Sequence, residues 1–344
     1  MQPRAASVRL KDIAARAGVS VMTVSKVMRD APDISAATKA KIKLLAQQMG
    51  YVPDPMAQGL RTGATKLLGL VISTVTNPIF SRIVLALEEQ AHELGYDLIL
   101  AQHHLKPERE EEVIRRLLAR RVDGLIVSPV YRLSQRAPAY DEIRARGTPA
   151  VILGHPALFC AGLPSVETED LRASAVITEH LIKLGHKRIA FFAGPTASPA
   201  AQERLEGYRH AMREANIEID DRLIFAAGNS IEDGAASALQ MLNEGTRPTA
   251  IQAFNDLVAI GAANVLLNQG LAVPGDISIT GFGNILMSEH FRVPLTTIRQ
   301  PKFRLGVAAM ELLAKLLRGE AAGSRRLEAE ILPRASSGPV PSKS

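Results

Sequence analysis

The spacing of apolar residues divides the chain into two parts with different predicted secondary structure. In the first part the apolar positions recur every three or four residues, which predicts helices over 10–17, 21–29 and 36–49. From residue 67 onward, near-continuous apolar runs alternate with amphipathic stretches, which predicts strands alternating with helices. Strands that are apolar throughout are typical of parallel sheets covered by helices on both faces. We therefore expect a small helical domain followed by a larger α/β region.

The α/β region contains the same strand–helix pattern twice in succession. Its apolar runs predict strands over 67–73, 96–102, 122–129, 149–154, 187–194, 222–227, 249–254 and 277–283. Its amphipathic stretches predict helices over 79–94, 108–120, 138–146, 170–184, 202–215, 231–244, 256–269 and 302–318. Two such series predict two similar lobes, each built on a doubly wound parallel sheet, with a cleft between them. Ligands bind to such sheets at the carboxyl ends of the strands, so the cleft is the expected ligand site.

The first two predicted helices have the signature of a helix-turn-helix. Gly18 is placed to end the first helix and Ser20 to cap the second, so only a short turn separates them. In a helix-turn-helix the second helix enters the major groove of DNA. An ordinary helical hairpin with a solvated polar face is the alternative.

The exposed face of the second helix supplies the predicted base contacts. Lys26 can donate a hydrogen bond to guanine, whereas Val21 and Met22 offer only apolar contact, for example with a thymine methyl group. Phosphate contacts position a protein on DNA without reading its sequence. The side chains best placed to make them are Lys11, Thr23 and Ser25.

The distribution of charge favours DNA binding over the plain hairpin. The net charge is +6, but residues 1–66 hold eleven Lys and Arg against four Asp and no Glu. The other 278 residues hold 30 basic and 31 acidic side chains. A basic block beside a neutral body is the electrostatic footprint of a phosphate-binding domain.

Composition places the chain among globular proteins of the cell interior. It is 47% hydrophobic and 22% charged, which is enough apolar material to bury a core. The one cysteine, Cys160, excludes an internal disulfide and fits a reducing compartment. The N-terminus has no apolar signal segment, and no uncharged apolar run approaches the roughly 20 residues of a membrane span. We therefore expect a cytoplasmic protein with no membrane partner.

Ordered motifs along most of the chain resemble the LacI/GalR family of bacterial repressors. They are LKDIAARAGVSVMTVSKVM, GYVPDPMAQGLRTGATKLLGLVIS, NPIF, LGHKRIAFFAGP, RLEGYRHAM, RPTAIQAFNDLVAIGA, LAVPGDISITGFGN, PLTTIRQP and RASSGP. Together they span about residues 8–339. The resemblance implies a helix-turn-helix DNA-binding domain over 8–53, a hinge helix and linker over 54–66, and an effector-binding domain over 67–340. The last of these would have the fold of periplasmic sugar-binding proteins.

The resemblance also implies how the effector domain is divided and what it does. Lobe 1 is expected at about 67–165 and 298–325, and lobe 2 at about 166–297 and 326–340. A homodimer would bind a palindromic operator in double-stranded DNA, and a sugar or related metabolite in the cleft would control its affinity. A solute-binding protein without a transcriptional role is the alternative, but it would need a signal peptide and no helix-turn-helix.

Residues 55–62 match the family's hinge helix, which forms when the dimer sits on its operator. Leu60 matches a leucine that wedges between base pairs in the minor groove. The predicted DNA contacts in and before this segment are Tyr51, Met56, Ala57 and Leu60. Pro55 and Gly59 depart from the family pattern, and the glycine costs about 1 kcal/mol of helix propensity, so we expect the helix to depend on DNA. A plain linker is the alternative.

The resemblance places the effector contacts around the cleft. Arg204 and Asp256 match the family's ligand-binding arginine and aspartate, a set of donors and an acceptor suited to hydroxyl-rich ligands. Further expected contacts, at the cleft edge or at strand ends, are Ile79, Phe80, His155, Asn229 and Asn284. Glycine stands at 154 and 283, where the family often has aspartate. An ion pair at the surface or between the lobes is the alternative role for Arg204 and Asp256.

Signals of enzymatic activity are weak. The segment GFGNIL at 281–286 has one GxG after a strand, but it lacks the third glycine of a dinucleotide-binding turn and no clear helix follows it. His103 and His104 have no further metal ligands nearby in the sequence, so we expect them to be solvated. The sequence identifies no general base that would activate the thiol of Cys160. We therefore expect a DNA-binding transcription repressor rather than an enzyme, with no cofactor and no metal.

Overall fold

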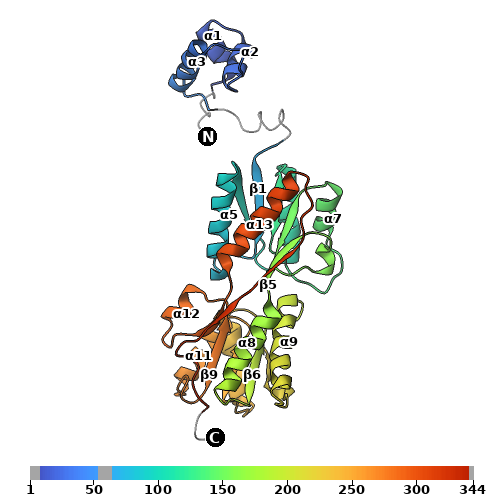
Figure 1. Ribbon diagram of the computed structural model, residues 1–344, viewed down its shortest axis with the longest axis vertical. Helices are drawn as coiled ribbons and strands as arrows, with labels where there is room; N and C mark the ends of the chain where they lie inside the picture. The colour runs from blue at the N-terminus through green and yellow to red at the C-terminus, as the bar shows by residue number, and fades with distance from the viewer. Residues whose placement is uncertain (1–7, 53–63, 341–344) are drawn as a thin grey trace, which may run out of the picture. The chain divides into compact units, whose positions relative to one another are not determined.

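The structure of the chain is a computed structural model that describes residues 8–52 and 64–340. The chain forms two compact units, which divide between Thr65 and Lys66. The first unit is helical and the second is α/β, so the fold class predicted from apolar spacing is confirmed (Figure 1).

Three short helices form the described part of the first unit. They are α1 (Leu10–Ala17), α2 (Val21–Val27) and α3 (Ala36–Gln48). Gly18 ends α1 with a φ of 68°, a left-handed conformation that glycine adopts without strain. Ser20 begins α2, because its hydroxyl accepts a hydrogen bond from the Thr23 amide at 3.1 Å. Helix α2 ends two residues earlier than its apolar spacing predicts, and α3 ends one residue earlier.

A small apolar core holds these helices together. Ile13 from α1, Val24 and Val27 from α2, and Ile42 from α3 are almost fully buried and contact one another. Because α2 points two of its seven residues into this core, its opposite face is fixed toward solvent. The core therefore sets which side chains of α2 are free to contact another molecule.

The second unit contains two six-stranded sheets, one in each lobe. In lobe 1 the strand order is β11-β5-β4-β3-β1-β2, and all the pairings are parallel. In lobe 2 the order is β12-β10-β9-β8-β6-β7, and only the β10–β12 pairing is antiparallel. The strands are β1 (Leu67–Ile72), β2 (Asp97–Gln102), β3 (Gly124–Val127), β4 (Ala150–Leu153), β5 (Ser165–Thr168), β6 (Ile189–Ala193), β7 (Ile224–Ala226), β8 (Ala250–Ala253), β9 (Ser278–Phe282), β10 (Thr296–Arg299), β11 (Arg325–Leu327) and β12 (Glu330–Leu332).

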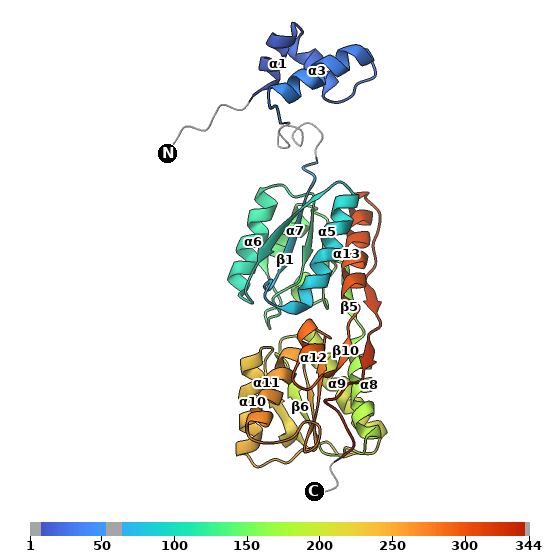
Figure 2. The same ribbon diagram turned by 90° about the vertical axis from the view of Figure 1, so that its left-hand side faces the viewer.

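Helices cover both faces of each sheet (Figure 2). Those of lobe 1 are α5 (Ser81–Glu93) and α13 (Lys302–Leu317) on one face, and α6 (Pro107–Ala119) and α7 (Pro138–Ala145) on the other. Those of lobe 2 are α8 (Asp170–Lys183) and α9 (Pro199–Glu214) on one face, and α10 (Ile231–Asn243) and α11 (Asp256–Asn268) on the other. Within the described residues, none of the helices has the length and apolarity needed to cross a bilayer.

Several short elements have no apolar run and are missed by the sequence prediction. The strands β5, β10, β11 and β12 read SVET, TTIR, RRL and EIL, so their polar residues hide them from a search for apolar runs. A five-residue helix, α12 (Leu286–His290), follows β9, where no clear helix was expected. These missed elements lie at the junction between the lobes.

The chain passes between the lobes three times, and each passage falls slightly later than predicted. The expected boundaries at 165, 298 and 325 lie inside strands β5, β10 and β11. The sheets place β5 and β11 in lobe 1 and β10 in lobe 2. The crossings therefore follow Thr168, Arg299 and Leu327, which corrects the boundaries by a few residues.

Candidate functional site

Helix α2 exposes two apolar side chains that are not part of the three-helix core. Met22 is 65% exposed and Val21 is 47% exposed, although both lie in the first turn of the helix. Lys26 lies in the last turn, and its ammonium makes an ion pair with Asp33. The hydrogen bond from Lys26 lowers the pKa of Asp33, so this carboxylate stays ionised. The outer face of α2 thus combines two apolar groups with one cation, as expected for contact with bases.

The remaining predicted DNA contacts of the first unit differ in accessibility. Lys11 is exposed on α1, whereas Thr23 and Ser25 are half-buried on α2. The Thr23 hydroxyl exchanges a hydrogen bond with the Ser20 hydroxyl at 2.9 Å. Tyr51 is half-buried and packs against the three-helix core. The predicted hinge contacts Met56, Ala57 and Leu60 lie outside the described residues.

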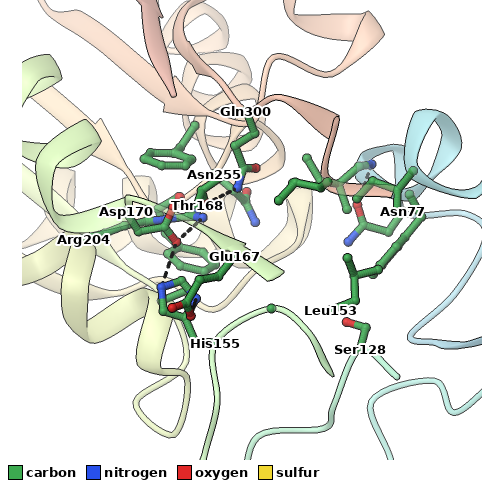
Figure 3. A pocket seen from close by; sticks show the side chains of 18 of the residues that line it. Asn77, Ser128, Leu153, His155, Glu167, Thr168, Asp170, Arg204, Asn255 and Gln300 are labelled. Atoms are coloured by element: carbon green, nitrogen blue, oxygen red, sulfur yellow. Dashed lines mark hydrogen bonds and ion pairs between the residues drawn. The ribbon is translucent and has the colours of Figure 1, made fainter. Parts of the chain in front are cut away.

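A cavity of about 220 Å³ lies between the two lobes of the second unit. It is built where strands of both sheets reach their carboxyl ends, as parallel-sheet topology predicts. Figure 3 shows a group of polar side chains, which includes His155, Asp170 and Arg204, facing Asn77, Ser128 and Leu153 across the pocket. Of the seven predicted effector contacts, the five that line the cavity are Ile79, Phe80, His155, Arg204 and Asp256.

Arg204 projects from α9 into this cavity and is held in place on several sides. Its Nη1 donates to the carbonyl of Phe254 at 2.7 Å, and its Nη2 donates to Asp170 at 3.1 Å. The guanidinium lies 3.6 Å from the ring centroid of Phe282 and 4.7 Å from that of Phe254. Its Nε is buried and has no hydrogen-bond partner among the described residues. Nε is therefore a buried donor that no described protein group satisfies.

Asp256 lines the cavity, but its carboxylate is already occupied. One oxygen accepts a hydrogen bond from Thr297 at 2.5 Å, and the other accepts from the Ile285 amide at 2.9 Å and from Ser288 at 2.7 Å. Burial raises the pKa of Asp256, against the opposing effect of these hydrogen bonds. These contacts fix the segment that follows β9, so Asp256 has a structural role that its sequence match does not indicate.

Asn255, the residue before Asp256, was not among the predicted contacts and also lines the cavity. Its side-chain oxygen caps α11 by accepting from the Val258 amide at 2.8 Å. Its amide nitrogen donates to the carbonyl of Asn229 at 3.0 Å and has a second hydrogen left to donate. The signal available in the sequence was the position of Asn255 between a predicted strand and a predicted helix.

His155 is buried among carboxylates from both lobes. Its Nε2 lies 3.1 Å from Glu203 on α9, and its Nδ1 lies 3.7 Å from Glu167 on β5. Burial alone lowers the pKa of His155, but the hydrogen bond with Glu203 and the nearby charges of Asp170 and Glu167 raise it by more. In turn, burial raises the pKa of Glu203, but the hydrogen bonds from His155 and Arg326 lower it to about 2. His155 and Arg326 in lobe 1 thus both bind Glu203 in lobe 2.

The crossings after β5 and after β10 contribute further cavity residues that the sequence prediction missed. Gln300 donates to the Thr168 hydroxyl at 3.0 Å, and Thr168 donates to Asp170 at 2.5 Å (Figure 3). Glu167 accepts from Arg326 at 2.7 Å through Oε1, whereas its buried Oε2 has no hydrogen-bond partner among the described residues. These side chains were overlooked because neither β5 nor β10 has an apolar run.

Two predicted contacts do not line the cavity. Asn229 lies before α10, where its amide donates to Asp233 at 3.0 Å and its carbonyl binds Asn255. Asn284 has a φ of 48°, and its side-chain oxygen accepts from Arg334 at 2.9 Å. Both asparagines make hydrogen bonds that fix loops of lobe 2. Their positions near strand ends therefore did not suffice to predict that they line the cavity.

The two glycines that replace family aspartates adopt backbone conformations that favour glycine. Gly154 has a φ of 126°, and a Cβ there would lie 2.8 Å from the Tyr131 hydroxyl. That hydroxyl donates to the carbonyl of His155 at 2.9 Å. Gly283 has a φ of 133°. Glycine at 154 therefore lets Tyr131 approach and hold the turn that carries His155.

The residues considered for metal or thiol chemistry, His103 and Cys160, are buried inside the fold. His103 is buried rather than solvated, which corrects the expectation, and its Nε2 lies 3.0 Å from the carbonyl of Ser128. Its Nδ1 accepts from the Leu105 amide at 3.1 Å. Cys160 is buried, and burial raises the pKa of its thiol. Across residues 8–52 and 64–340, no group of three His, Cys, Asp or Glu side chains is placed to hold a metal ion.

Comparisons with known proteins match both units. Residues 9–54 match the model of "Bacterial regulatory proteins, lacI family", and residues 65–332 match "Periplasmic binding proteins and sugar binding domain of LacI family". The chain is 31% identical to the HTH-type transcriptional repressor CytR of Escherichia coli (strain K12), over 96% of this chain and 97% of that protein.

Solved structures are similar over the same extent. The lac repressor dimer bound to operator and the anti-inducer ONPF has a TM-score of 0.84 and 31% identity, covering 97% of this chain and 100% of that one. A complex of the transcriptional regulator CelR with cellobiose has a TM-score of 0.73 and 29% identity, covering 96% of this chain and 99% of that one.

Proposed function

Because the chain belongs to the LacI family of bacterial regulatory proteins, and is therefore a DNA-binding transcription regulator, we propose how its two units divide the work of repression. The first unit binds one half of a palindromic operator through α2, and a homodimer binds both halves. The second unit binds a sugar or related metabolite between its lobes. As a regulator of transcription the protein acts in the cytoplasm, and it carries out no catalysis.

The interlobe cavity carries this proposal. It is lined by both lobes, mixes apolar walls with convergent polar groups, and holds a buried donor at Arg204 and a buried acceptor at Glu167 that have no partners among the described residues. Buried polar groups are normally hydrogen-bonded, so such atoms indicate a ligand that completes them. Relatives support the same assignment, since CelR is described in complex with cellobiose.

Dimeric operator binding follows from the limited reach of one unit. Helix α2 has only seven residues, of which Val21, Met22 and Lys26 form the outer face. One such helix reads only a few base pairs, and two copies related by a dyad read a palindrome with the required specificity. The lac repressor is described as a dimer bound to operator, which supports the same arrangement here.

Coupling between the sites passes through the segment that joins the units, which includes Met56, Ala57 and Leu60. A ligand that changes how the lobes close alters where this segment starts, and so biases its contacts in the minor groove. Leu60→Ala should therefore lose most of the discrimination between operator and random DNA, measured by fluorescence anisotropy, while ligand binding persists. Equal discrimination in Leu60→Ala and wild type would remove this segment from the mechanism.

A two-part experiment tests the proposed function. A thermal-shift screen of sugars and nucleosides should find a compound that raises the melting temperature, because a ligand that binds only folded protein stabilises it. Gel shifts against fragments of the genome should then identify an operator whose affinity changes with that compound. A compound that binds without any effect on DNA affinity would favour a solute-binding role instead.

A further inference from the structure

The acidic side chain at the end of β5 is the least explained group in the interlobe cavity. Glu167 is 95% buried, with only 5% of its surface exposed. Its Oε1 is bound by Arg326, but its Oε2 lies 3.7 Å from His155, too far for a hydrogen bond. A buried acceptor without a donor is costly, so Glu167 is set to receive a hydrogen bond from a ligand.

Arg204, the guanidinium in the cavity, is poorly placed to bind an anion. Arginine holds carboxylate and phosphate groups with two parallel N–H donors. Here Nη1 and Nη2 each already donate one hydrogen bond, to the carbonyl of Phe254 and to Asp170, and Nε is buried without a partner among the described residues. The charge of Arg204 is also balanced by Asp170 at 3.1 Å.

The cations that the structure describes around the cavity are balanced by carboxylates. Its lining includes the carboxylates of Glu167, Asp170 and Asp256, against one guanidinium and the His155 imidazole. Beyond this lining, Glu203 and Arg326 add one charge of each sign, and the buried Lys302 adds a cation whose charge acts on Asp256. Among the described residues no cation is therefore left over to offset the cost of burying a phosphate or carboxylate in this cavity.

The rest of the lining offers neutral contacts only. Besides the charged side chains, the polar side chains of the lining are those of Asn77, Ser128, Tyr131, Thr168, Asn255 and Gln300, several of which are labelled in Figure 3. The wall on the lobe 1 side is apolar and is formed by Ile79, Phe80, Ile83, Leu153 and Leu305. Amides and hydroxyls pair well with ligand hydroxyls, and the apolar wall suits the carbon face of a ring.

We propose that Glu167 is a specificity-determining residue, which accepts a hydrogen bond from an uncharged, hydroxyl-bearing ligand and makes the cavity reject anionic counterparts of that ligand. Sugar phosphates, sugar acids and nucleotides are thereby excluded, and neutral sugars or nucleosides are selected. This inference rests on the proposed function, because it specifies the ligand class of the same cavity.

Matched probes test the selection against charge. The wild-type protein is titrated by calorimetry with D-glucose, D-gluconate and glucose 6-phosphate, with D-ribose and ribose 5-phosphate, and with adenosine and AMP. At least one neutral member should bind, and its anionic partner should bind at least tenfold more weakly. Tighter binding of the anionic member would overturn the inference and leave the effector function standing. If none of the probes binds, the choice of a neutral sugar or nucleoside is wrong, whereas intact operator binding would retain the DNA-binding role.

Variants of Glu167 test whether its carboxylate is responsible for selecting neutral over anionic ligands. Glu167→Gln keeps the shape but removes the charge, so affinity for the neutral probe should fall roughly tenfold or more, as loss of a charged hydrogen bond predicts. The double change Glu167→Gln/Asp170→Asn should also bring measurable binding of the anionic partner, because it removes the charge that balances Arg204. The control Glu112→Gln, on an exposed part of α6, should change neither affinity. Melting temperatures without ligand check folding, and unaltered selectivity in a folded Glu167→Gln protein would overturn the assignment.

Discussion

The ammonium of Lys26, in the last turn of α2, makes an ion pair with the carboxylate of Asp33 in the loop before α3. Both side chains are partly exposed, so water screens the pair and its net contribution to stability is small. The pair nevertheless has a consequence for DNA recognition. Lys26 must exchange a carboxylate oxygen for the acceptors of a base when it reaches the major groove.

Lys26→Ala should weaken binding to the true operator by about 1–3 kcal/mol and relax the preference at one base pair. The reason is that Lys26 is the cation on the exposed face of α2, where base edges are read. Lys11→Ala provides the matched comparison, since an exposed lysine on α1 should contact phosphate and lower affinity for all sequences alike. Selection of binding sites from random DNA measures both effects. An unchanged base preference in Lys26→Ala would show that another face reads the operator.

Asp33→Asn should strengthen binding to operator and random DNA by a few-fold, because it releases the Lys26 ammonium from its intramolecular partner. Binding isotherms at several salt concentrations should show a salt dependence steeper by about one ion. Combining Asp33→Asn with Lys26→Ala should cancel most of the gain. A gain that persists in the double variant would mean that Asp33 acts through the general charge of the domain instead.

The three helices of the first unit were predictable because their apolar residues and caps are local in sequence. Val24 and Val27 define the buried face of α2, and Ser20 fixes its start, so the exposed face follows from helical geometry alone. The partner of Lys26 was not predictable, because nothing in the sequence indicates that the loop after α2 returns Asp33 toward it.

In the second unit, the apolar strands were predictable and the crossings were not. Strands β5 and β10 are short and polar. Strand β5 nevertheless carries Glu167 and Thr168, and β10 carries Thr297, which binds Asp256. A family match placed Arg204 at the cavity, but the same reasoning could not show that Asp256 already binds three donors. Hydrogen-bond saturation depends on residues that are distant in sequence, so only the folded structure reveals it.

Arg204→Ala and Asp256→Ala should therefore have different effects. Arg204→Ala should abolish the ligand response, because it removes a guanidinium whose Nε has no partner among the described residues. Asp256→Ala leaves the donors from Thr297, Ile285 and Ser288 without their acceptor, and should lower the free energy of unfolding of the second unit by about 2–4 kcal/mol. Urea denaturation and ligand calorimetry on both variants separate the two roles. Full stability in Asp256→Ala would contradict the structural role given to this carboxylate.

Two buried histidines make the stability of the second unit depend on pH, and their effects have opposite signs. Burial lowers the pKa of His103 to about 4, from the 6.5 of an exposed histidine, despite its hydrogen bond to the Ser128 carbonyl. The pKa of His155 is raised instead, by Glu203, Asp170 and Glu167, which together outweigh its burial. The stabilisation from His155 is complete below pH 6.5 and is lost as the pH rises through its folded pKa.

Acidification should therefore destabilise the protein through His103. Because its folded pKa lies below its unfolded pKa, the contribution of His103 is present above pH 6.5 and is lost as the pH falls toward 4, by up to about 3 kcal/mol. Urea denaturation at pH 7.5, 6, 5 and 4 measures the loss. His103→Gln, which cannot gain a proton, should flatten the profile in this range. His155→Gln is the matched control and should leave the slope below about pH 5.5 unchanged, since His155 is then protonated in both the folded and the unfolded state. A profile that stays equally steep in His103→Gln would show that other groups, such as the neutral and buried His186, cause the acid sensitivity.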